Sequence, residues 1–254
     1  GTGPSRVELD WQVEPEDAKR YEMDAGRATT VWSVGDAAPQ SSGRPRLREL
    51  LGAFSRDDRR FKLEYFDAGR SLEPESSSPL GSDTLEGARR GGRGRGKYAW
   101  VRSYIEAAAT EDALSTSAEL RQNGVVLATG PAGARAFSTA LAQVTSKLRF
   151  AAVEQRGKQR ACLFTRSSGS TVELSALSGS ESAAVLFAAA FAGLGLARSL
   201  VLIDLPELGI HPEDQATLFA RLCALSSDMQ IIAATTSPAL LRAAPRDRVL
   251  LLPG

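Results

Sequence analysis

The segment that most constrains the fold of this chain is Ser199–Pro212, with the sequence SLVLIDLPELGIHP. Its apolar run Leu200–Ile203 leads directly into Asp204, and Pro206 follows soon afterwards. A short apolar run that stops at a turn signal is typical of a buried strand in a parallel sheet. Open α/β sheets bind ligands at the carboxyl ends of such strands, where nucleotide-binding proteins use an aspartate to hold hydrated Mg²⁺. The sequence therefore predicts an α/β fold with a ligand crevice beside Asp204.

A second apolar strand is expected downstream, after an intervening helix. Residues Glu213–Leu225 place leucine and phenylalanine side chains on one helical face, and Gln230–Thr235 form the next apolar run. Two apolar strands joined by an amphipathic helix predict a parallel β-α-β unit with a right-handed crossover. A last strand is expected at Arg248–Leu252.

The segment Leu174–Glu181, LSALSGSE, opens a long apolar helix that is expected at Glu181–Leu196. Exposed N–H groups at a helix start and the positive end of the helix dipole favour a bound anion there. The same residues also have an ordinary structural explanation, because Ser178 and Glu181 have the spacing of a capping box. The residues alone leave both interpretations open.

Elsewhere, hydrophobic periodicity and turn residues predict elements with less chemical meaning. The expected strands are Val7–Val13, Ala28–Val34 and Phe61–Phe66, with a hairpin formed by Ala161–Thr165 and Thr171–Leu174. The expected helices are Leu47–Phe54, Tyr98–Ala109, Glu111–Gln122 and Ala134–Arg149.

The order of hairpin, serine-led helix start, apolar helix and acid-tipped strand resembles the ABC-type P-loop ATPases of the RecF/SMC/OLD kind. The strand with D-x-P-E-L-x-x-H-P resembles their Walker B segment, and Ser178–Glu181 resembles their signature motif. The resemblance implies a P-loop NTPase-like α/β fold with a parallel-sheet lobe, an antiparallel β-subdomain and a helical lobe. It places the β-subdomain and helical lobe in residues 1–170, and the signature and Walker B lobe in residues 171–254.

The resemblance also implies ATP and Mg²⁺ as ligands and assigns roles to individual residues. Asp204 would lie on the metal side, and a homo- or heterodimer would form through the signature face. The residues that would contact a nucleotide held by the partner subunit are Ser178, Gly179, Ser180 and Glu181. Secondary candidates at the site are Glu207, His211, which matches the histidine of the family motif, and Thr236.

Three departures from the family pattern argue against efficient catalysis. Leu205 stands where relatives carry the glutamate that polarises the attacking water, and Thr236 stands at their γ-phosphate histidine. No G-x-x-x-x-G-K-[ST] phosphate loop occurs, and Gly1–Arg6, GTGPSR, has Pro4 where such a loop has lysine. General-base assistance alone is worth ~10²–10⁴ in rate. We therefore expect little or no ATP hydrolysis, so that whether the chain is an active enzyme stays open.

Other interpretations remain beside this one. The chain can be the C-terminal part of an active ATP-binding protein with its phosphate loop upstream, or a regulatory subunit that supplies the signature to a partner. Residues 71–97 are expected to form a flexible loop, whose basic stretch Arg89–Lys97 either follows a nucleic-acid backbone or has no dedicated partner. Arg70 is expected either to face a phosphate or to be a solvated loop residue.

Composition excludes several other classes of protein. The chain has 31 Lys and Arg against 30 Asp and Glu, which gives no overall attraction to nucleic acid or membranes. Cys162 and Cys223 lack C-x-x-C spacing and are expected to be core residues, and with His211 as the single histidine no metal cluster is indicated. Ala183–Ala197 is too short to span a bilayer, and Gly1–Asp10 has no signal-peptide core. We therefore expect a cytoplasmic protein without membrane contact.

Overall fold

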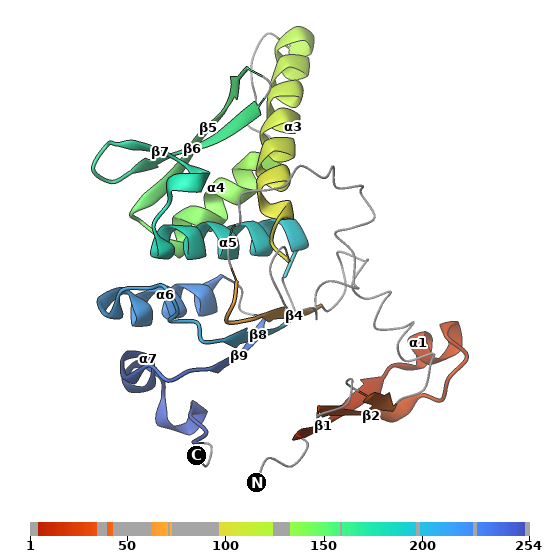
Figure 1. Cartoon of the computed structure of the whole chain (residues 1–254). Helices are drawn as coiled ribbons and strands as arrows, with labels where there is room; N and C mark the ends of the chain where they lie inside the picture. The colour runs from red at the N-terminus through yellow and green to blue at the C-terminus, as the bar shows by residue number, and fades with distance from the viewer. Residues whose placement is uncertain are drawn as a thin grey trace. The chain divides into compact units, whose positions relative to one another are not determined.

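The computed structural model of this chain describes residues 5–34, 40–42, 62–70, 72, 97–123, 133–157, 159–196, 199–225 and 228–251. The chain separates into two compact units, Gly1–Arg60 and Phe61–Gly254 (Figure 1). The division at residue 170 follows family roles rather than contacts, and it stays a prediction. The expected helix at Leu47–Phe54 and the arginines of the basic stretch lie outside the described residues.

The first unit contains an antiparallel sheet in the order β1-β2-β3. Strands β1 (Ser5–Val13) and β2 (Gly26–Val34) pair along their whole length, and β3 (Gln40–Ser42) pairs with the end of β2. The short helix α1 (Pro15–Arg20) lies between them in sequence, and its Ala18 packs with Val13. The two strands expected in this region are therefore confirmed.

The second unit contains a parallel sheet in the order β4-β8-β9, formed by β4 (Leu63–Phe66), β8 (Leu200–Asp204) and β9 (Gln230–Ala234). Helix α6 (Pro212–Ala224) connects β8 to β9, which confirms the expected parallel β-α-β unit. Strand β4 was expected in the antiparallel subdomain, and this was wrong, because β4 pairs in parallel with β8. Because β8 is far from β4 in sequence, the residues of β4 alone do not predict that the two strands pair.

Within the second unit, the described residues cover one face of this parallel sheet and leave the other face open. Residues that pair in register share a face, so Phe66, Ile203 and Ala233 lie together, and all three belong to or pack on the main core. On the opposite face, Leu202 is half-buried and Ile232 is 52% exposed. Parallel sheets normally have helices on both faces, so this open face is unusual.

The antiparallel sheet of the second unit has the order β5-β6-β7. Strands β6 (Gln159–Arg166) and β7 (Thr171–Glu173) form the expected hairpin, and the 3₁₀ helix η3 (Leu174–Ala176) follows. The expected helix Ala134–Arg149 was wrong at its end, because α4 (Gly133–Val144) stops and β5 (Leu148–Arg156) begins. Leu148 fits the helical apolar stripe, but it is buried as the first paired residue of β5.

Two further expectations at helices and strands are corrected. Helix α3 (Trp100–Asn123) is continuous, where two helices were expected. The last expected strand is absent from the described part of its range, because Arg248 ends the 3₁₀ helix η4 (Arg246–Arg248) and residues 249–251 pair with no strand. Before it lies α7 (Pro238–Ala243). Cys162 is buried as expected, but Cys223 is exposed on α6.

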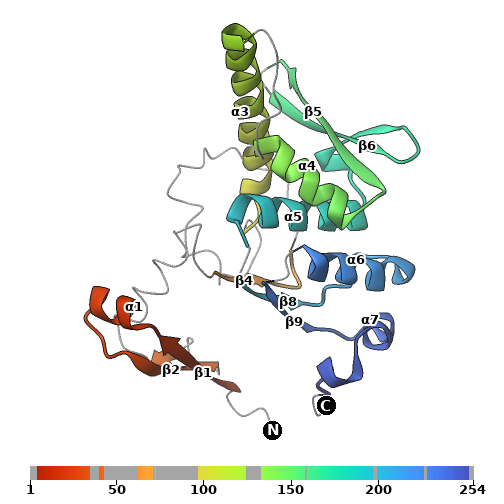
Figure 2. The same ribbon diagram turned by 180° about the vertical axis from the view of Figure 1, so that it is seen from behind.

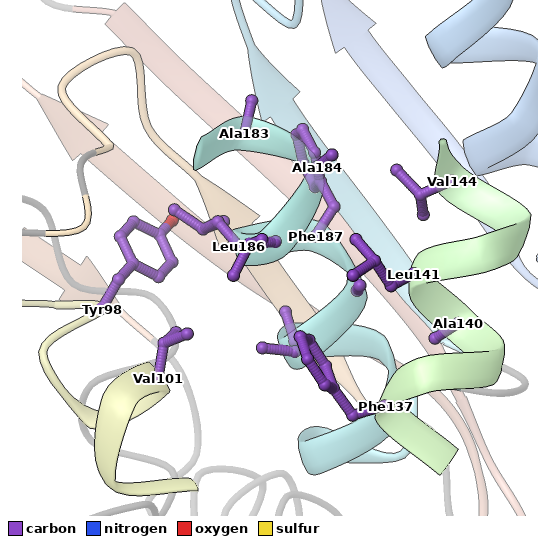
Figure 3. Close-up of a cluster of buried hydrophobic side chains, with 14 of the residues drawn as sticks. Tyr98, Val101, Phe137, Ala140, Leu141, Val144, Ala183, Ala184, Leu186 and Phe187 are labelled. Atoms are coloured by element: carbon purple, nitrogen blue, oxygen red, sulfur yellow. The ribbon is translucent and has the colours of Figure 1, made fainter. Parts of the chain in front are cut away.

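Helix α5 (Gly179–Leu194) is the centre of the core. It lies between α3 and α4 on one side and the parallel sheet on the other (Figure 1, Figure 2). Residues 183–190 are all buried, as expected for a helix that is apolar on every side. Leu186 and Phe187 face Leu141 from α4 and Val101 from α3 in the close-up (Figure 3). The start of α5 lies against the turn after β8, where Gly179 approaches Gly209 closely.

No helix in the described parts of the chain is long and apolar enough to cross a membrane.

Candidate functional site

The candidate site is the carboxyl end of β8 and the turn that follows it. Asp204 is the last residue of this central strand, where it pairs in register with Ala234 of β9 and is partly exposed. The turn is closed by two short-range bonds, in which Leu208 N–H donates to the Leu205 carbonyl at 3.0 Å and Ile210 N–H to the Glu207 carbonyl at 3.0 Å. Asp204 thus stands at the sheet edge where α/β proteins bind ligands.

Leu205 has a left-handed backbone, with φ of 45°. Such a conformation costs a side-chain-bearing residue roughly 1–2 kcal/mol and persists only when the surroundings impose it. The Leu205 N–H donates to the Ala234 carbonyl at 2.8 Å, which extends the β8–β9 ladder by one bond. Because its side chain has no polar atom, Leu205 cannot take a proton from water, in contrast to the glutamate that the resemblance assigns to this position.

Arg70, from the loop after β4, holds this turn from the side. Its Nη1 donates to the Asp204 carbonyl at 2.8 Å, and its Nη2 donates to the carbonyls of Leu205 at 2.8 Å and Pro206 at 3.1 Å. Burial lowers the pKa of Arg70 below its usual range. The expectation of a solvated loop residue was wrong, since the guanidinium lies partly buried against backbone carbonyls. Sequence reasoning missed the contact because the partners are 134 to 136 positions away.

Glu207 connects the turn to the segment after β9. Its Oε2 accepts the hydroxyl proton of Thr235 at 2.8 Å, and its Oε1 accepts the N–H of Thr236 at 2.9 Å and its hydroxyl at 3.3 Å. Burial acts to raise the pKa of Glu207, but these bonds and one from its own backbone amide outweigh burial and lower the pKa. Glu207 is therefore ionised and already occupied by donors. Thr236, where the resemblance implies a histidine, is one of those donors.

The start of α5 has the geometry of a capping box. The Glu181 N–H donates to Ser178 Oγ at 3.4 Å, and Ser178 N–H donates to Glu181 Oε2 at 2.8 Å. Arg166 adds two bonds, from Nε to Oε1 at 2.6 Å and from Nη2 to Oε2 at 2.9 Å. The Arg166 bond is the main reason that the pKa of Glu181 falls to about 2. Glu181 therefore has a complete set of partners within its own chain.

The start of α5 also touches the turn after β8. A Cβ on Gly179 would approach the Gly209 carbonyl oxygen at 2.7 Å, and Ser180 Oγ donates to the same oxygen at 3.4 Å. Gly209 itself has φ of 78°, which favours glycine. The structure thus brings Gly179 and Ser180 together with the loop that begins at Asp204.

His211 caps the next helix rather than lining the turn. Its Nδ1 accepts the N–H of Glu213 at 3.4 Å at the start of α6, and its side chain is 65% exposed. Ser237 plays a similar part at α7, where Oγ accepts the N–H of Leu240 at 3.2 Å and donates to Gln215 Oε1 at 2.6 Å. Helix capping is therefore a sufficient structural role for both His211 and Ser237.

Lys97, the last residue of the basic stretch, is not available to a nucleic-acid backbone. Its Nζ lies 2.9 Å from Glu64 Oε1, and the two side chains are 6% and 1% exposed. It also donates to the Tyr65 carbonyl and lies near the rings of Tyr65 and Tyr98. The expectation that Arg89–Lys97 follows a phosphate backbone is therefore wrong for Lys97, because this residue belongs to the interior beside β4.

The described residues fit one part of a magnesium–nucleotide site. They contain no group of three or more His, Cys, Asp or Glu side chains placed to hold a metal ion. Mg²⁺ keeps several waters and typically uses one or two carboxylates with substrate phosphates, so Asp204 alone fits the metal side. On the phosphate side the fit fails, since Arg70, the cation at this turn, is bound to carbonyl oxygens.

The chain matches the family described as "AAA domain, putative AbiEii toxin, Type IV TA system" over residues 10–242. It is similar to a solved SMC head bound to the C-winged helix domain of ScpA, with a TM-score of 0.51 and 13% identity over 95% of this chain and 69% of that chain. It is also similar to an SMC head with an extended coiled coil bound to the C-terminal domain of ScpA, derived from Pyrococcus furiosus, with a TM-score of 0.52 and 14% identity over 95% and 72%.

At these identities the likeness shows the fold alone, and it confirms the expected α/β arrangement of parallel and antiparallel sheets. No curated protein sequence matches this chain significantly.

Proposed function

This chain belongs to the AAA-domain family that covers its residues 10–242, and from that premise we propose that it is an ABC-type ATPase-like domain with weak or no ATP hydrolysis of its own. The observation that carries the proposal is the turn after Asp204. Leu205 offers no base there, and Glu207 already accepts three hydrogen bonds from the two threonines. The fold is similar to that of SMC heads, while at this turn Leu205 is apolar and the carboxylate of Glu207 already accepts hydrogen bonds.

Glu207 is a poor substitute for the missing base. A general base needs a free lone pair within hydrogen-bond reach of water and a pKa near the working pH. The carboxylate of Glu207 instead accepts three hydrogen bonds from Thr235 and Thr236, which help to lower its pKa. Loss of general-base assistance costs ~10²–10⁴ in rate, enough to bring a phosphoryl-transfer turnover of ~1–100 s⁻¹ close to background.

Nucleotide contact through the start of α5 is proposed for Ser178, Gly179 and Ser180. Glu181 acts differently, because it is bound by Arg166 and by the Ser178 amide and so orients the helix start from within. A partner subunit with a phosphate loop would meet this face, in a homo- or heterodimer. Asp204 is the proposed ligand on the metal side of the chain's own site, where bound Mg²⁺ would neutralise phosphate charge.

The test compares the purified chain with its Asp204→Ala variant in a phosphate-release assay with ATP and magnesium. We expect the same background release from both proteins, at least about 100-fold below ~1 s⁻¹. Turnover of ~1 s⁻¹ that disappears in the Asp204→Ala variant would overturn the proposal. Circular dichroism of both proteins provides the control for folding.

A second candidate function is favoured by the open face of the parallel sheet. Ile232 is 52% exposed on that face, and β9 pairs with only β8 among the described strands. Parallel sheets are normally buried on both faces. We also propose that a phosphate-binding strand, loop and helix from outside these 254 residues, in a longer chain or in a partner, cover this face and complete an active site.

This second candidate is tested by adding a phosphate-loop partner, or by extending the chain with the codons upstream of it. Completion of the site predicts that amide exchange in β9 slows and that a fluorescent ATP analogue binds. With the site completed, Leu205→Glu is expected to raise turnover above that of Leu205→Gln, which has the same size but no base. Unchanged exchange in β9 and no nucleotide binding would count against it.

A further inference from the structure

Arg70 makes an uncommon set of contacts for a buried arginine. Its guanidinium donates to the carbonyl oxygens of three consecutive residues, Asp204 to Pro206, and Nη1 also donates to the Asp67 carbonyl at 3.2 Å. The centre of the guanidinium lies 5.5 Å from the ring centroid of Phe187 on α5. One side chain from the loop after β4 therefore touches the turn after β8 and the central helix.

Three consecutive carbonyls rarely meet one cation, because successive carbonyls of an extended strand point in opposite directions. The left-handed Leu205 reverses the backbone at this point, and the reversal allows its neighbours' oxygens to converge. A strained residue of this kind persists only where surrounding bonds hold it. The two bonds donated by Nη2, to Leu205 and Pro206, supply that constraint.

The contacts of Glu207 depend on the conformation of this turn. Glu207 follows Pro206 directly, and its carboxylate reaches Thr235 and Thr236 after β9. If Leu205 relaxed to an ordinary conformation, the chain after it would leave in another direction and Glu207 would lose these partners. The position of Arg70 on one side of the turn is thereby linked to the contacts of Glu207 on the other.

We propose that Arg70 is a positioning residue, which holds Leu205 in its left-handed conformation and so sets the direction of Asp204 and the attachment of Glu207 to Thr236. The proposal deepens the proposed function, because it names the residue that shapes the metal-side turn. It concerns the geometry of the turn in the nucleotide-free protein. Its tests therefore need no ATP and can fail independently of the ATPase assay.

The main test measures amide hydrogen exchange at Thr236, whose N–H donates to Glu207. Arg70→Lys keeps the positive charge, but a single ammonium group cannot reproduce the fork of two nitrogens over these carbonyls. The matched control is Lys62→Met, which removes another buried cation beside β4 that donates to the Leu194 carbonyl at 2.6 Å, at the end of α5. We expect the amide hydrogen of Thr236 to exchange at least about tenfold faster in Arg70→Lys than in Lys62→Met, compared under conditions where the two variants are equally stable.

A second readout follows the carboxylate itself. The pKa of Glu207 is held low partly by Thr235 and Thr236, so it should rise towards its ordinary value in Arg70→Lys and stay low in Lys62→Met. Addition of Leu205→Gly to Arg70→Lys should restore slow exchange at Thr236, because glycine adopts the left-handed conformation without strain.

Equal Thr236 exchange and equal Glu207 pKa in Arg70→Lys and the control would overturn the proposal. Failure of Leu205→Gly to restore protection would also contradict it. If Arg70→Lys does not fold, the Thr236 exchange rate is instead compared between two single variants, Leu205→Gly and Leu205→Ala. Slower Thr236 exchange with glycine than with alanine supports the role of the left-handed turn, and equal or faster exchange refutes it.

Discussion

Arg166 and Glu181 form a two-point ion pair at the start of the central helix, with Nε to Oε1 at 2.6 Å and Nη2 to Oε2 at 2.9 Å. The pair joins the hairpin strand β6 to α5 and uses the carboxylate that the capping box also needs. The conformation of the start of α5 is thus stabilised by hydrogen bonds from residues of the same chain, Arg166 and Ser178.

The first prediction concerns this pair and pH. The pKa of Glu181 lies near 2 in the folded chain against 4.5 for a free side chain, so its ionised form stabilises the fold above pH 4.5. That stability is lost as the pH falls from 4.5 towards 2. Glu181→Gln, which keeps a capping-box side chain, should cost about 1–2 kcal/mol at pH 7. Urea denaturation at a series of pH values should show the difference shrinking below pH 4.5.

Asp214→Asn is the control for this first prediction. It removes an exposed pair with Lys147, whose side chain is 65% exposed, and should cost less than about 1 kcal/mol. A cost for Glu181→Gln that stayed constant down to pH 2 would contradict the assignment of its low pKa to the Arg166 bond.

The second prediction concerns the strain at Leu205. Leu205→Gly and Leu205→Ala remove nearly the same side chain, but only glycine adopts φ of 45° freely. Glycine usually destabilises a chain relative to alanine through its backbone entropy. Here we expect Leu205→Gly to be the more stable variant by about 1 kcal/mol in thermal unfolding. A more stable alanine variant would mean that the turn is not left-handed in solution.

The third prediction concerns the close approach of two glycines. A methyl group at position 179 would lie 2.7 Å from the Gly209 carbonyl oxygen, so Gly179→Ala must push the turn away from α5. We expect a loss of about 1–3 kcal/mol in the free energy of unfolding. Ser180→Ala, which removes only a 3.4 Å hydrogen bond, should cost less than about 1 kcal/mol. Similar stabilities of the two variants in urea would rule out the close contact.

The fourth prediction concerns the buried pair of Lys97 and Glu64. Removal of one partner leaves a charge without compensation in the interior, so Lys97→Met should destabilise the protein by about 3–5 kcal/mol. The double variant with Glu64→Gln should recover part of this loss. Lys147→Met, at an exposed pair, is the matched control and should cost less than about 1 kcal/mol. Equal losses for Lys97→Met and Lys147→Met would place Lys97 at the surface.

Local patterns predicted the elements that carry their own signal. The strand that ends at Asp204 and the apolar helix behind Ser178 were found where expected, since a hydrophobic period and a stop residue lie within each segment. Errors arose where one pattern fits two structures. Leu148 continues the apolar stripe of a helix, but it is the first residue of β5. The four residues of β4 contain no pattern that predicts pairing with β8.

The sequence by itself determined the β8 strand, the capped start of α5 and the apolar Leu205 in the turn after Asp204, because each depends on residue types and spacing within a few positions. Only the tertiary structure decided what surrounds that turn. Arg70 reaches its carbonyls from 134 to 136 positions away, and Glu207 reaches Thr236 from 29. Such contacts arise from chain packing, which brings distant polar groups together wherever burial leaves them in need of partners.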